Sequence, residues 1–246
     1  MSTSSSMNKH MIHPLKHACL GCLLLAMVFS IAGCEAFAFF TQVISPEKTP
    51  AVFDLPPVRT AILVDDTSNQ LGDPNHTGVI AQRMIFDFVQ SQKLTQEQTV
   101  NYRFVRDLEG KLGTDFERTP VDEIGRTLGA DQVIHVNIDY VQMSVQPGII
   151  EPKAIVTLKV IDVIKAIRLF PEPSPVSDIE GLETSKRGYR ISVELPRSVM
   201  MEIDSGTKNL LYRQLAEQIG YQAARVFYKH PAEEDGKGPG KPSTEG

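Results

Sequence analysis

Residues 119–145 read TPVDEIGRTLGADQVIHVNIDYVQMSV, and this stretch decides the fold because a helix ends and a long strand begins within it. The Thr119-Pro120 pair is typical of a helix start: threonine can cap and proline suits the first position. The acidic pair Asp122-Glu123 favours the positive end of the helix dipole. Leu128-Gly129 predicts the helix end, since glycine readily adopts the left-handed conformation there. From Asp131 the apolar residues alternate with polar ones, which predicts a strand.

This strand, Asp131–Val145, would present two different faces, because successive side chains of a strand point in opposite directions. One face would be mostly apolar, with Ile134, Val136, Ile138 and Tyr140. The other would carry Val133, His135, Asn137, Asp139 and Val141. Ala154–Ile164 is predicted as a second long strand, joined to the first through a turn at Pro147-Gly148. The pattern favours an antiparallel pair with one wetter face.

Other elements can be placed around this pair. Thr60–Val64 is a continuous apolar run, typical of a strand buried on both faces. Residues 77–92 have apolar residues at helical spacing, and a short strand is predicted at Tyr102–Val105. A further strand is predicted at Tyr189–Leu195. A last helix would be capped by Asp204 or Ser205, with one stripe formed by Leu211, Leu215, Ile219, Ala223 and Phe227.

The resulting order, β-α-β-α-β-β-β-α, predicts an α/β sandwich. We expect a mixed sheet of about five strands with about three helices packed on it. The aromatic residues of the last helix could instead dock a partner helix, but packing on the sheet is the favoured interpretation.

The N-terminal 33 residues are predicted to be a signal peptide. The polar stretch before His17 contains Lys9, Lys16 and no acid, and either Met1 or Met7 could be the start. The apolar run that follows, 18–32, has 15 residues, fewer than the roughly 20 that a membrane-spanning helix needs.

This run ends in Ile31-Ala-Gly-Cys34, which resembles the lipobox of bacterial lipoproteins. The resemblance implies cleavage between Gly33 and Cys34 and acylation of the Cys34 thiol, with palmitate as one of the chains. Two or three acyl chains together would anchor the protein stably. Glu35 follows the cysteine and mildly favours the outer membrane. The alternative is an ordinary signal peptide or an uncleaved anchor, since the apolar character continues at Ala36–Phe40.

The cysteine content agrees with this interpretation. Cys19 and Cys22 have the spacing of a metal or redox pair, but both lie within the predicted signal. The mature chain would keep Cys34 alone, used by lipid. Removing residues 1–33 takes away two lysines and no acid, so the net charge changes from −5 to −7. Such an acidic surface argues against nucleic acid as a partner.

The mature chain is expected to form one domain between two flexible segments. Residues 34–58, rich in proline, would be a tether that starts at the lipidated cysteine. Residues 59–230 would form the α/β domain, and 231–246, almost without apolar residues, a disordered tail.

A family resemblance is carried by Val121–His135, in which a helix ending in Leu-Gly-Ala-Asp runs directly into a strand. This segment resembles the group of envelope lipoproteins that includes the N-terminal domain of TolB and CsgG. The element order over 60–164 and the pattern Val160-Ile-Asp-Val163 followed by Arg168-Leu-Phe-Pro171 are similar to that group as well. The resemblance implies the fold and an envelope location, not a chemistry. A CsgG-like channel is not expected, because no transmembrane β-hairpins are recognised.

An acidic cluster after the first strand is the main candidate for a ligand site. It contains Asp65, Asp66, Asp73 and His76 with Asn69 and Asn75 nearby. These oxygen donors could hold a hard cation at the carboxyl end of a strand. However, Gln70 occupies the position where an EF-hand loop needs glycine, so a solvated loop is favoured and no metal is predicted.

His135, Asn137 and Asp139 are a second candidate, since they alternate along one strand face and could orient a histidine against a carboxylate. No serine or cysteine elbow, phosphate-binding loop, dinucleotide turn or HExxH motif accompanies them. The favoured interpretation is the wet face of a strand, with no cofactor.

We therefore expect a lipid-anchored, periplasm-facing protein of the bacterial cell envelope. It would be a non-enzymatic interaction or assembly component with an envelope protein as its partner. One alternative is an accessory subunit of a transport or secretion system. A less favoured one is a hydrolase that uses Asp65, Asp66 and His76.

Overall fold

The computed structural model describes residues 48–146, 149–172, 188–196, 198–199 and 204–231. Residues 50–230 form one compact unit. The two-residue strands β1 (Lys48–Thr49) and β8 (His230–Pro231) form a small two-stranded sheet. The predicted signal peptide, Cys34, the turn at Pro147-Gly148 and the tail from residue 232 lie outside the described residues.

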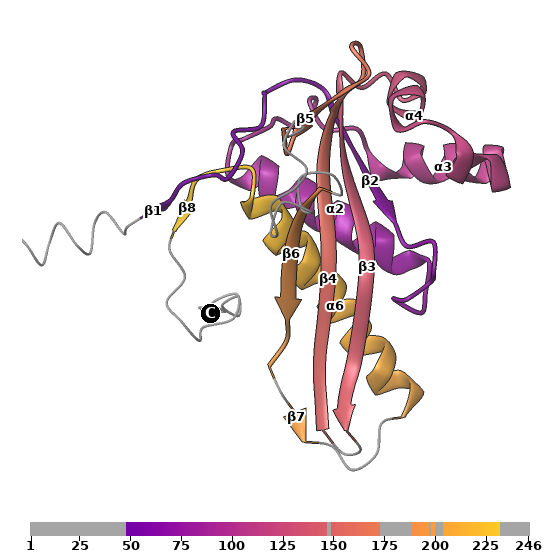
Figure 1. Ribbon diagram of the computed structural model, residues 1–246, viewed down its shortest axis with the longest axis vertical. Helices are drawn as coiled ribbons and strands as arrows, with labels where there is room; N and C mark the ends of the chain where they lie inside the picture. Colours follow the sequence, from indigo (N-terminus) through magenta and orange to yellow (C-terminus); the bar gives the residue numbers. More distant parts are fainter. Residues whose placement is uncertain (1–47, 147–148, 173–187, 197, 200–203, 232–246) are drawn as a thin grey trace, which may run out of the picture. The chain divides into compact units, whose positions relative to one another are not determined.

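The compact unit is built on one mixed sheet (Figure 1). Its strands are β2 (Thr60–Asp65), β3 (Gln132–Gln146), β4 (Ile149–Asp162), β5 (Ile167–Phe170), β6 (Tyr189–Glu194) and the two-residue β7 (Ser198–Val199). Strand β2 pairs with β3 in parallel, and β3 pairs with β4 antiparallel. Strands β5, β6 and β7 each pair antiparallel with β4. The prediction of an α/β fold with a mixed sheet and an antiparallel central pair is confirmed.

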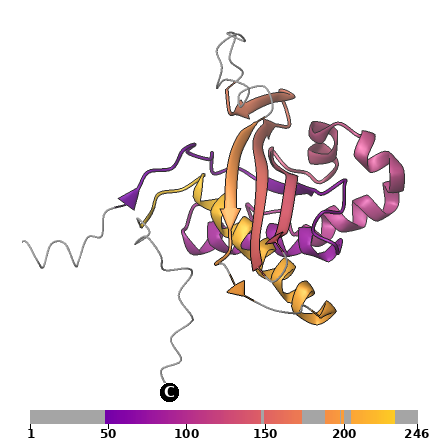
Figure 2. The ribbon, with the colours of Figure 1, turned by 60° about the horizontal axis from the view of Figure 1, so that its bottom comes forward.

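Helices cover the two faces of this sheet unequally. The described helices are α2 (Asn75–Gln90), α3 (Tyr102–Leu112), the 3-10 helix η1 (Gly113–Arg118), α4 (Val121–Thr127) and α6 (Ser205–Arg225). Helices α2 and α6 lie side by side under one face, whereas α3 and α4 lie near the β2 edge (Figure 2). Helix α4 packs on the opposite face at the start of β3. A Cβ added to its Gly125 would lie 2.7 Å from Val133 Cγ2 and 2.5 Å from Val163 Cγ2.

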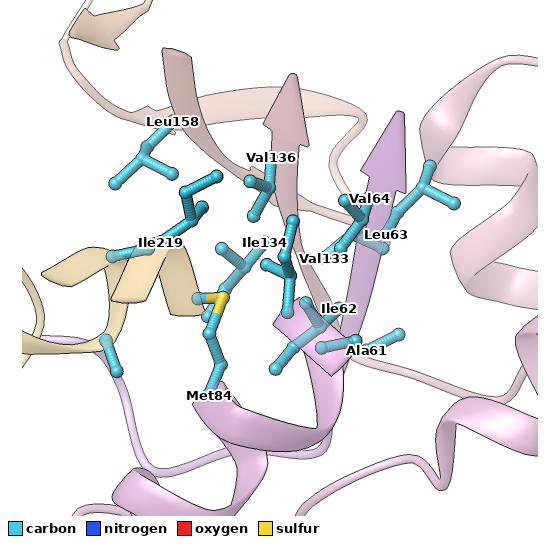
Figure 3. Packing of buried hydrophobic residues seen from close by; sticks show 14 of the residues in the cluster. Ala61, Ile62, Leu63, Val64, Met84, Val133, Ile134, Val136, Leu158 and Ile219 are labelled. Carbon is cyan, nitrogen blue, oxygen red and sulfur yellow. The ribbon is translucent and has the colours of Figure 1, made fainter. Parts of the chain in front are cut away.

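The core lies between the sheet and the pair of helices α2 and α6. Met84 of α2 and Ile219 of α6 approach Ile134 and Leu158 of the sheet, and all four are fully buried (Figure 3). The two helices approach closely because Gly220 has no side chain; a Cβ there would lie 2.7 Å from the carbonyl oxygen of Ile80. The predicted helix stripes therefore serve the core of the domain.

The structure confirms one of two predicted helix caps, at the start of α6, and contradicts the other, at the start of α4. The Asp204 carboxylate caps α6 by accepting from the Thr207 N–H at 2.6 Å, as expected. Thr119 does not cap α4. Its hydroxyl donates to the Asp115 carbonyl at 2.8 Å, and Pro120 precedes the first helical residue. Gly129 ends this helix region with a φ of +66°, which agrees with the left-handed conformation expected there.

The predicted strand at Tyr102–Val105 is wrong, because these residues begin helix α3. Asn101 caps the helix by accepting from the Arg103 N–H at 2.9 Å. Tyr102 and Val105 are three residues apart and both buried, which is the spacing of a helix face. The Tyr102 hydroxyl also donates to Thr77 Oγ1 at 3.1 Å, which attaches α3 to α2.

Residues 50–58, expected as the last part of the tether, belong to the folded unit. Leu55 is fully buried. The Val52 and Phe53 N–H groups both donate to the Val226 carbonyl, at 2.9 and 3.1 Å. The Phe53 ring stacks on Phe170 with centroids 5.0 Å apart. These contacts fix the chain from Val52 onward, seven residues before the expected start of the domain.

Candidate functional site

A row of polar side chains crosses the sheet on the face opposite α2 and α6, which we call the outer face. Strand register aligns Asp65 of β2 with Asn137 of β3, Asn137 with Thr157 of β4, and Thr157 with Arg190 of β6. We call these four residues the polar row. Adjacent strands lie about 4.8 Å apart, so the row is about 14 Å long. It has a carboxylate at one end and a guanidinium at the other.

A β-bulge at Asp139 places a further carboxylate beside the row. Ile138 lies opposite Val156 and Tyr140 lies opposite Ile155, so Asp139 is the extra residue of β3. The bulge reverses the alternation that follows. Tyr140 therefore lies on the outer face and is 45% exposed, whereas strict alternation predicts it on the same face as Ile134 and Val136. That assignment is wrong because strict alternation does not allow for an extra residue.

The Asp139 carboxylate binds two members of the polar row. Its Oδ1 accepts from Asn137 Nδ2 at 2.6 Å, and its Oδ2 accepts from the Thr157 hydroxyl at 2.5 Å. Both oxygens thus have a partner, and the two side chains are held in one orientation. The arrangement produces a fixed polar surface in the middle of the outer face.

Gln70 fixes the bulge from the loop that follows β2. The β2–β3 pairing ends at Asp65 and Asn137, so the next backbone groups of β3 need other partners on that side. The Gln70 side-chain amide donates to the Ile138 and Asp139 carbonyls at 3.3 and 3.1 Å, and it accepts from the Val141 N–H at 2.9 Å. The Gln70 carboxamide therefore makes hydrogen bonds to the β3 backbone of the kind that a longer β2 would have made.

A cavity of about 510 Å³ lies over three members of the polar row, Asn137, Thr157 and Arg190. Thr67 and Ser68 line one side of it, and Gly188 and Arg190 line the other. Gly188 has to be glycine there: its φ is +131°, and a Cβ would lie 2.4 Å from Thr157 Cγ2. The Arg190 side chain is exposed at the rim, so its guanidinium is accessible to a partner.

A second cavity, of about 350 Å³, lies beyond the β2 end of the row and shares Thr67 with the first. Here His135 Nε2 lies 3.8 Å from Asp65 Oδ2, which is too long for a hydrogen bond but close enough for an ion pair when the imidazole is protonated. The Thr67 hydroxyl donates to Asp65 Oδ1 at 2.6 Å. The His135 side chain and the Thr67 contacts lower the pKa of Asp65 below its usual value, against the opposing effect of burial.

The structure places the four acidic-cluster residues in separate local contacts. Asp65 faces His135, whereas both Asp66 oxygens accept from the backbone of its own loop, from Gln70 N–H at 2.8 Å and Leu71 N–H at 2.9 Å. Asp73 accepts from the Asn75 N–H at 2.8 Å, at the start of α2. His76 is buried, and its Nδ1 lies 2.9 Å from the Leu71 carbonyl. Within the described residues, no three acidic, histidine or cysteine side chains are grouped to hold a metal ion.

The second sequence candidate is partly brought together. Asn137 and Asp139 are hydrogen-bonded, but His135 faces Asp65 of the neighbouring strand rather than Asp139. Sequence reasoning missed Gln70, Thr157, Gly188 and Arg190. The only local signal for these residues was Gly188, which directly precedes the strand that carries Arg190. The other contacts join residues far apart in the chain.

The predicted lipidation site lies outside the described residues, so Gly33 and Cys34 remain a prediction from the lipobox. Across the described part of the chain, none of the helices combines the length and the apolar character that crossing a bilayer requires.

No family model matches the chain, and a search of the curated proteins finds no match either. Among solved structures, the chain is similar to lipoprotein GNA1162 from Neisseria meningitidis, with 13% identity, a TM-score of 0.37, and coverage of 67% of this chain and 99% of that one. It is also similar to the PelC dodecamer from Paraburkholderia phytofirmans (9% identity, TM-score 0.35, 75% and 98% coverage). A third similar structure is the hypothetical protein CT253 from Chlamydia trachomatis, with 12% identity, a TM-score of 0.37, and coverage of 70% of this chain and 98% of that one. Likenesses of this size carry no information about what this chain binds, and the resemblance to the TolB and CsgG group stays a prediction.

Proposed function

We propose that this chain is a lipoprotein of the bacterial cell envelope, held by acyl chains on Cys34, whose α/β domain binds a partner protein through the outer face of its sheet. The anchor is supported by the lipobox Ile31-Ala-Gly-Cys34 at the end of a 15-residue apolar run. The domain would face the periplasm, and Glu35 supports the outer membrane as its location.

The observation that carries the binding role is the polar row with its fixed bulge. Asp65 and Arg190 present opposite charges about 14 Å apart, a length that an extended peptide segment of about four residues spans. Such a segment would place a basic group near Asp65 and an acidic group near Arg190. Tyr140 and Arg190 are both exposed, and tyrosine and arginine are among the residue types enriched at the energetic centres of protein interfaces.

A non-enzymatic role is supported by how the polar groups of the row are used. The Thr157 hydroxyl donates to Asp139, and the second Asp139 oxygen is occupied by Asn137. Together these contacts hold the two side chains in place and fix the shape of the surface beside the bulge.

Metabolic labelling with an alkyne palmitate tests the anchor. We expect label on the wild-type chain and none on Cys34→Ala. The double variant Cys19→Ala/Cys22→Ala is a matched control, because it removes two cysteines of the predicted signal and should leave the label unchanged. Equal labelling of Cys34→Ala and the wild type would refute the lipoprotein assignment.

Photocrosslinking in cells tests the binding face. A photoreactive residue at Tyr140 should crosslink to one protein, and the same residue at Phe86 should not, because Phe86 is 54% exposed on helix α2, on the other side of the sheet. Arg190→Ala should abolish the product, whereas Ser192→Ala, two residues further along the same strand, should leave it intact. A product that is indifferent to Arg190→Ala would contradict the proposed face. A crosslinked permease or channel subunit would assign the transport-accessory role.

A further inference from the structure

The turn between β4 and β5 lies at the top of the domain in Figure 1, and two large apolar side chains in and directly after it are exposed. Ile164 is 79% exposed and Ile167 is 50% exposed. Ile164 is more exposed than any other large apolar side chain of the described chain. Single exposed apolar residues are ordinary on protein surfaces, but two on one protruding turn form a small apolar tip.

This tip is held in place by the structure around it. The Lys165 N–H donates to Asp162 Oδ1 at 2.8 Å, and the Lys165 ammonium lies 3.2 Å from Asp162 Oδ2. Val163 is buried, and its N–H donates to the Asp131 carbonyl at 2.9 Å. The turn therefore presents Ile164 outward while the residue before it is fixed against α4 and β3.

The chain that leads back to Cys34 leaves the domain beside the strand that carries this tip. Phe53 stacks on Phe170, the last residue of β5, and β5 begins with Ile167. The compact unit begins at Pro50, 16 residues after Cys34. A fully extended chain of that length spans about 55 Å, so an acyl anchor on Cys34 would keep the domain within that distance of the bilayer.

We infer that the β4–β5 turn inserts Ile164 and Ile167 into the headgroup region of the bilayer that holds the Cys34 acyl chains. This inference rests on the lipid anchor of the proposed function. Two isoleucines bind a membrane too weakly alone, but the anchor makes their contact an intramolecular event at high effective concentration. The pairing of Lys165 with Asp162 keeps the tip close to neutral, although the mature chain is acidic.

Contact of the tip with the bilayer would also set the distance between the polar row and the membrane surface. Thr157 lies five residues before Asp162 on β4, a rise of about 17 Å along the strand. The row would then meet partner segments that extend a short distance from the membrane surface.

Fluorescence quenching in vesicles tests the inference on the full lipidated protein. The mature chain has no cysteine other than acylated Cys34, so Ile164→Cys can be labelled with an environment-sensitive dye. After reconstitution in phosphatidylethanolamine and phosphatidylglycerol vesicles, lipids with a quencher near the headgroup should quench this dye severalfold more than one at Leu210→Cys. Leu210 is the matched control because it is 55% exposed in the first turns of helix α6. Adding Ile167→Asp should reduce the quenching at position 164, and Phe104→Asp, at an exposed residue of α3, should not.

The outcomes separate this inference from the anchor. If Cys34 takes up palmitate and the dye at 164 is quenched no more than the dye at 210, the tip does not contact lipid and only this inference fails. If the dye is shielded only when another membrane protein is present, the tip is a protein contact and the inference fails in the same way. If Cys34 is not acylated, the proposed function and this inference fail together.

Discussion

The two faces of the sheet are built from the same strands but are organised by different rules. On β4, Ala154, Val156, Leu158 and Val160 point toward α2 and α6 and are all fully buried. The residues between them lie on the outer face, where Thr157 joins a hydrogen-bonded row and Lys159 is half-exposed. The covered face is stabilised by apolar side chains that fill the core volume in close contact. The outer face is organised by directional hydrogen bonds and by charged groups. Substitutions on the covered face should therefore have the larger effect on stability, and those on the outer face the larger effect on recognition.

The largest contrast is expected between two adjacent residues of β4. Leu158→Ala on the covered face should lower the free energy of unfolding by about 2–5 kcal/mol, since it leaves a cavity in a closed core. Lys159→Ala on the outer face should change it by no more than about 0.5 kcal/mol. Urea unfolding of the two variants measures both values. Similar losses would mean that the outer face is packed as tightly as the core.

A pair of glycine substitutions sharpens the same comparison at the helices. Gly220→Ala should destabilise the protein by about 1–3 kcal/mol, because the new Cβ would lie 2.7 Å from the Ile80 carbonyl and from Arg83 Cβ. Gly110→Ala, in exposed helix α3 with nothing within 4 Å of the new Cβ, should stabilise by about 0.5–1 kcal/mol. The shifts in thermal midpoint should have opposite signs. A shift of the same sign in both variants would be inconsistent with the close α2–α6 contact.

A smaller effect is expected where the loop after β2 meets the bulge. Gln70→Ala removes three hydrogen bonds to β3 and should cost about 1 kcal/mol of stability. It should also weaken crosslinking from Tyr140 more than the stability change alone would. Gln82→Ala, at an exposed residue of α2, is the control and should change neither quantity. Retention of full crosslinking in Gln70→Ala would show that the bulge does not need this support.

The smallest effect concerns pH. The pKa of Asp65 is lower in the folded chain than its usual value of 3.8, so its contribution to stability is present above that value. The contribution is lost as pH falls through the lower, folded pKa. Wild type should be more stable than Asp65→Asn at pH 6, and the difference should shrink when both are unfolded in urea at pH 3. An unchanged difference in stability between the two proteins would mean that the charge of Asp65 does not contribute to the stability of the fold.

Much of the fold was predictable because its main signals are periodic and local. The long strands β3 and β4, the stripe on α6 and the cap at Asp204 follow directly from spacing and residue type. The error at Tyr102–Val105 arose because aromatic and β-branched residues favour strands, whereas here the Asn101 cap and burial of one face determine a helix.

The candidate site was less predictable because its contacts are long-range. Gln70 reaches residues 68 to 71 positions away, and Thr157 reaches Asp139 across the central strand pair. Whether Tyr140 lies on the covered face or on the outer face depends on one bulge, which shows no clear sequence signal. Register and bulges are properties of paired strands, and a single strand sequence does not determine them.

The carboxamide of Gln70 also affects how copies of this protein behave when crowded. An exposed strand edge is a template on which another chain can extend the sheet, and the β2–β3 pairing stops at Asp65 and Asn137. Gln70 occupies the hydrogen-bonding groups at the next positions of β3, so a neighbouring copy cannot add a strand there. With the proposed lipid anchor, copies would be confined to a membrane plane and would meet one another often and in few orientations. A side chain that closes one edge thus protects the sheet from aggregation under those conditions.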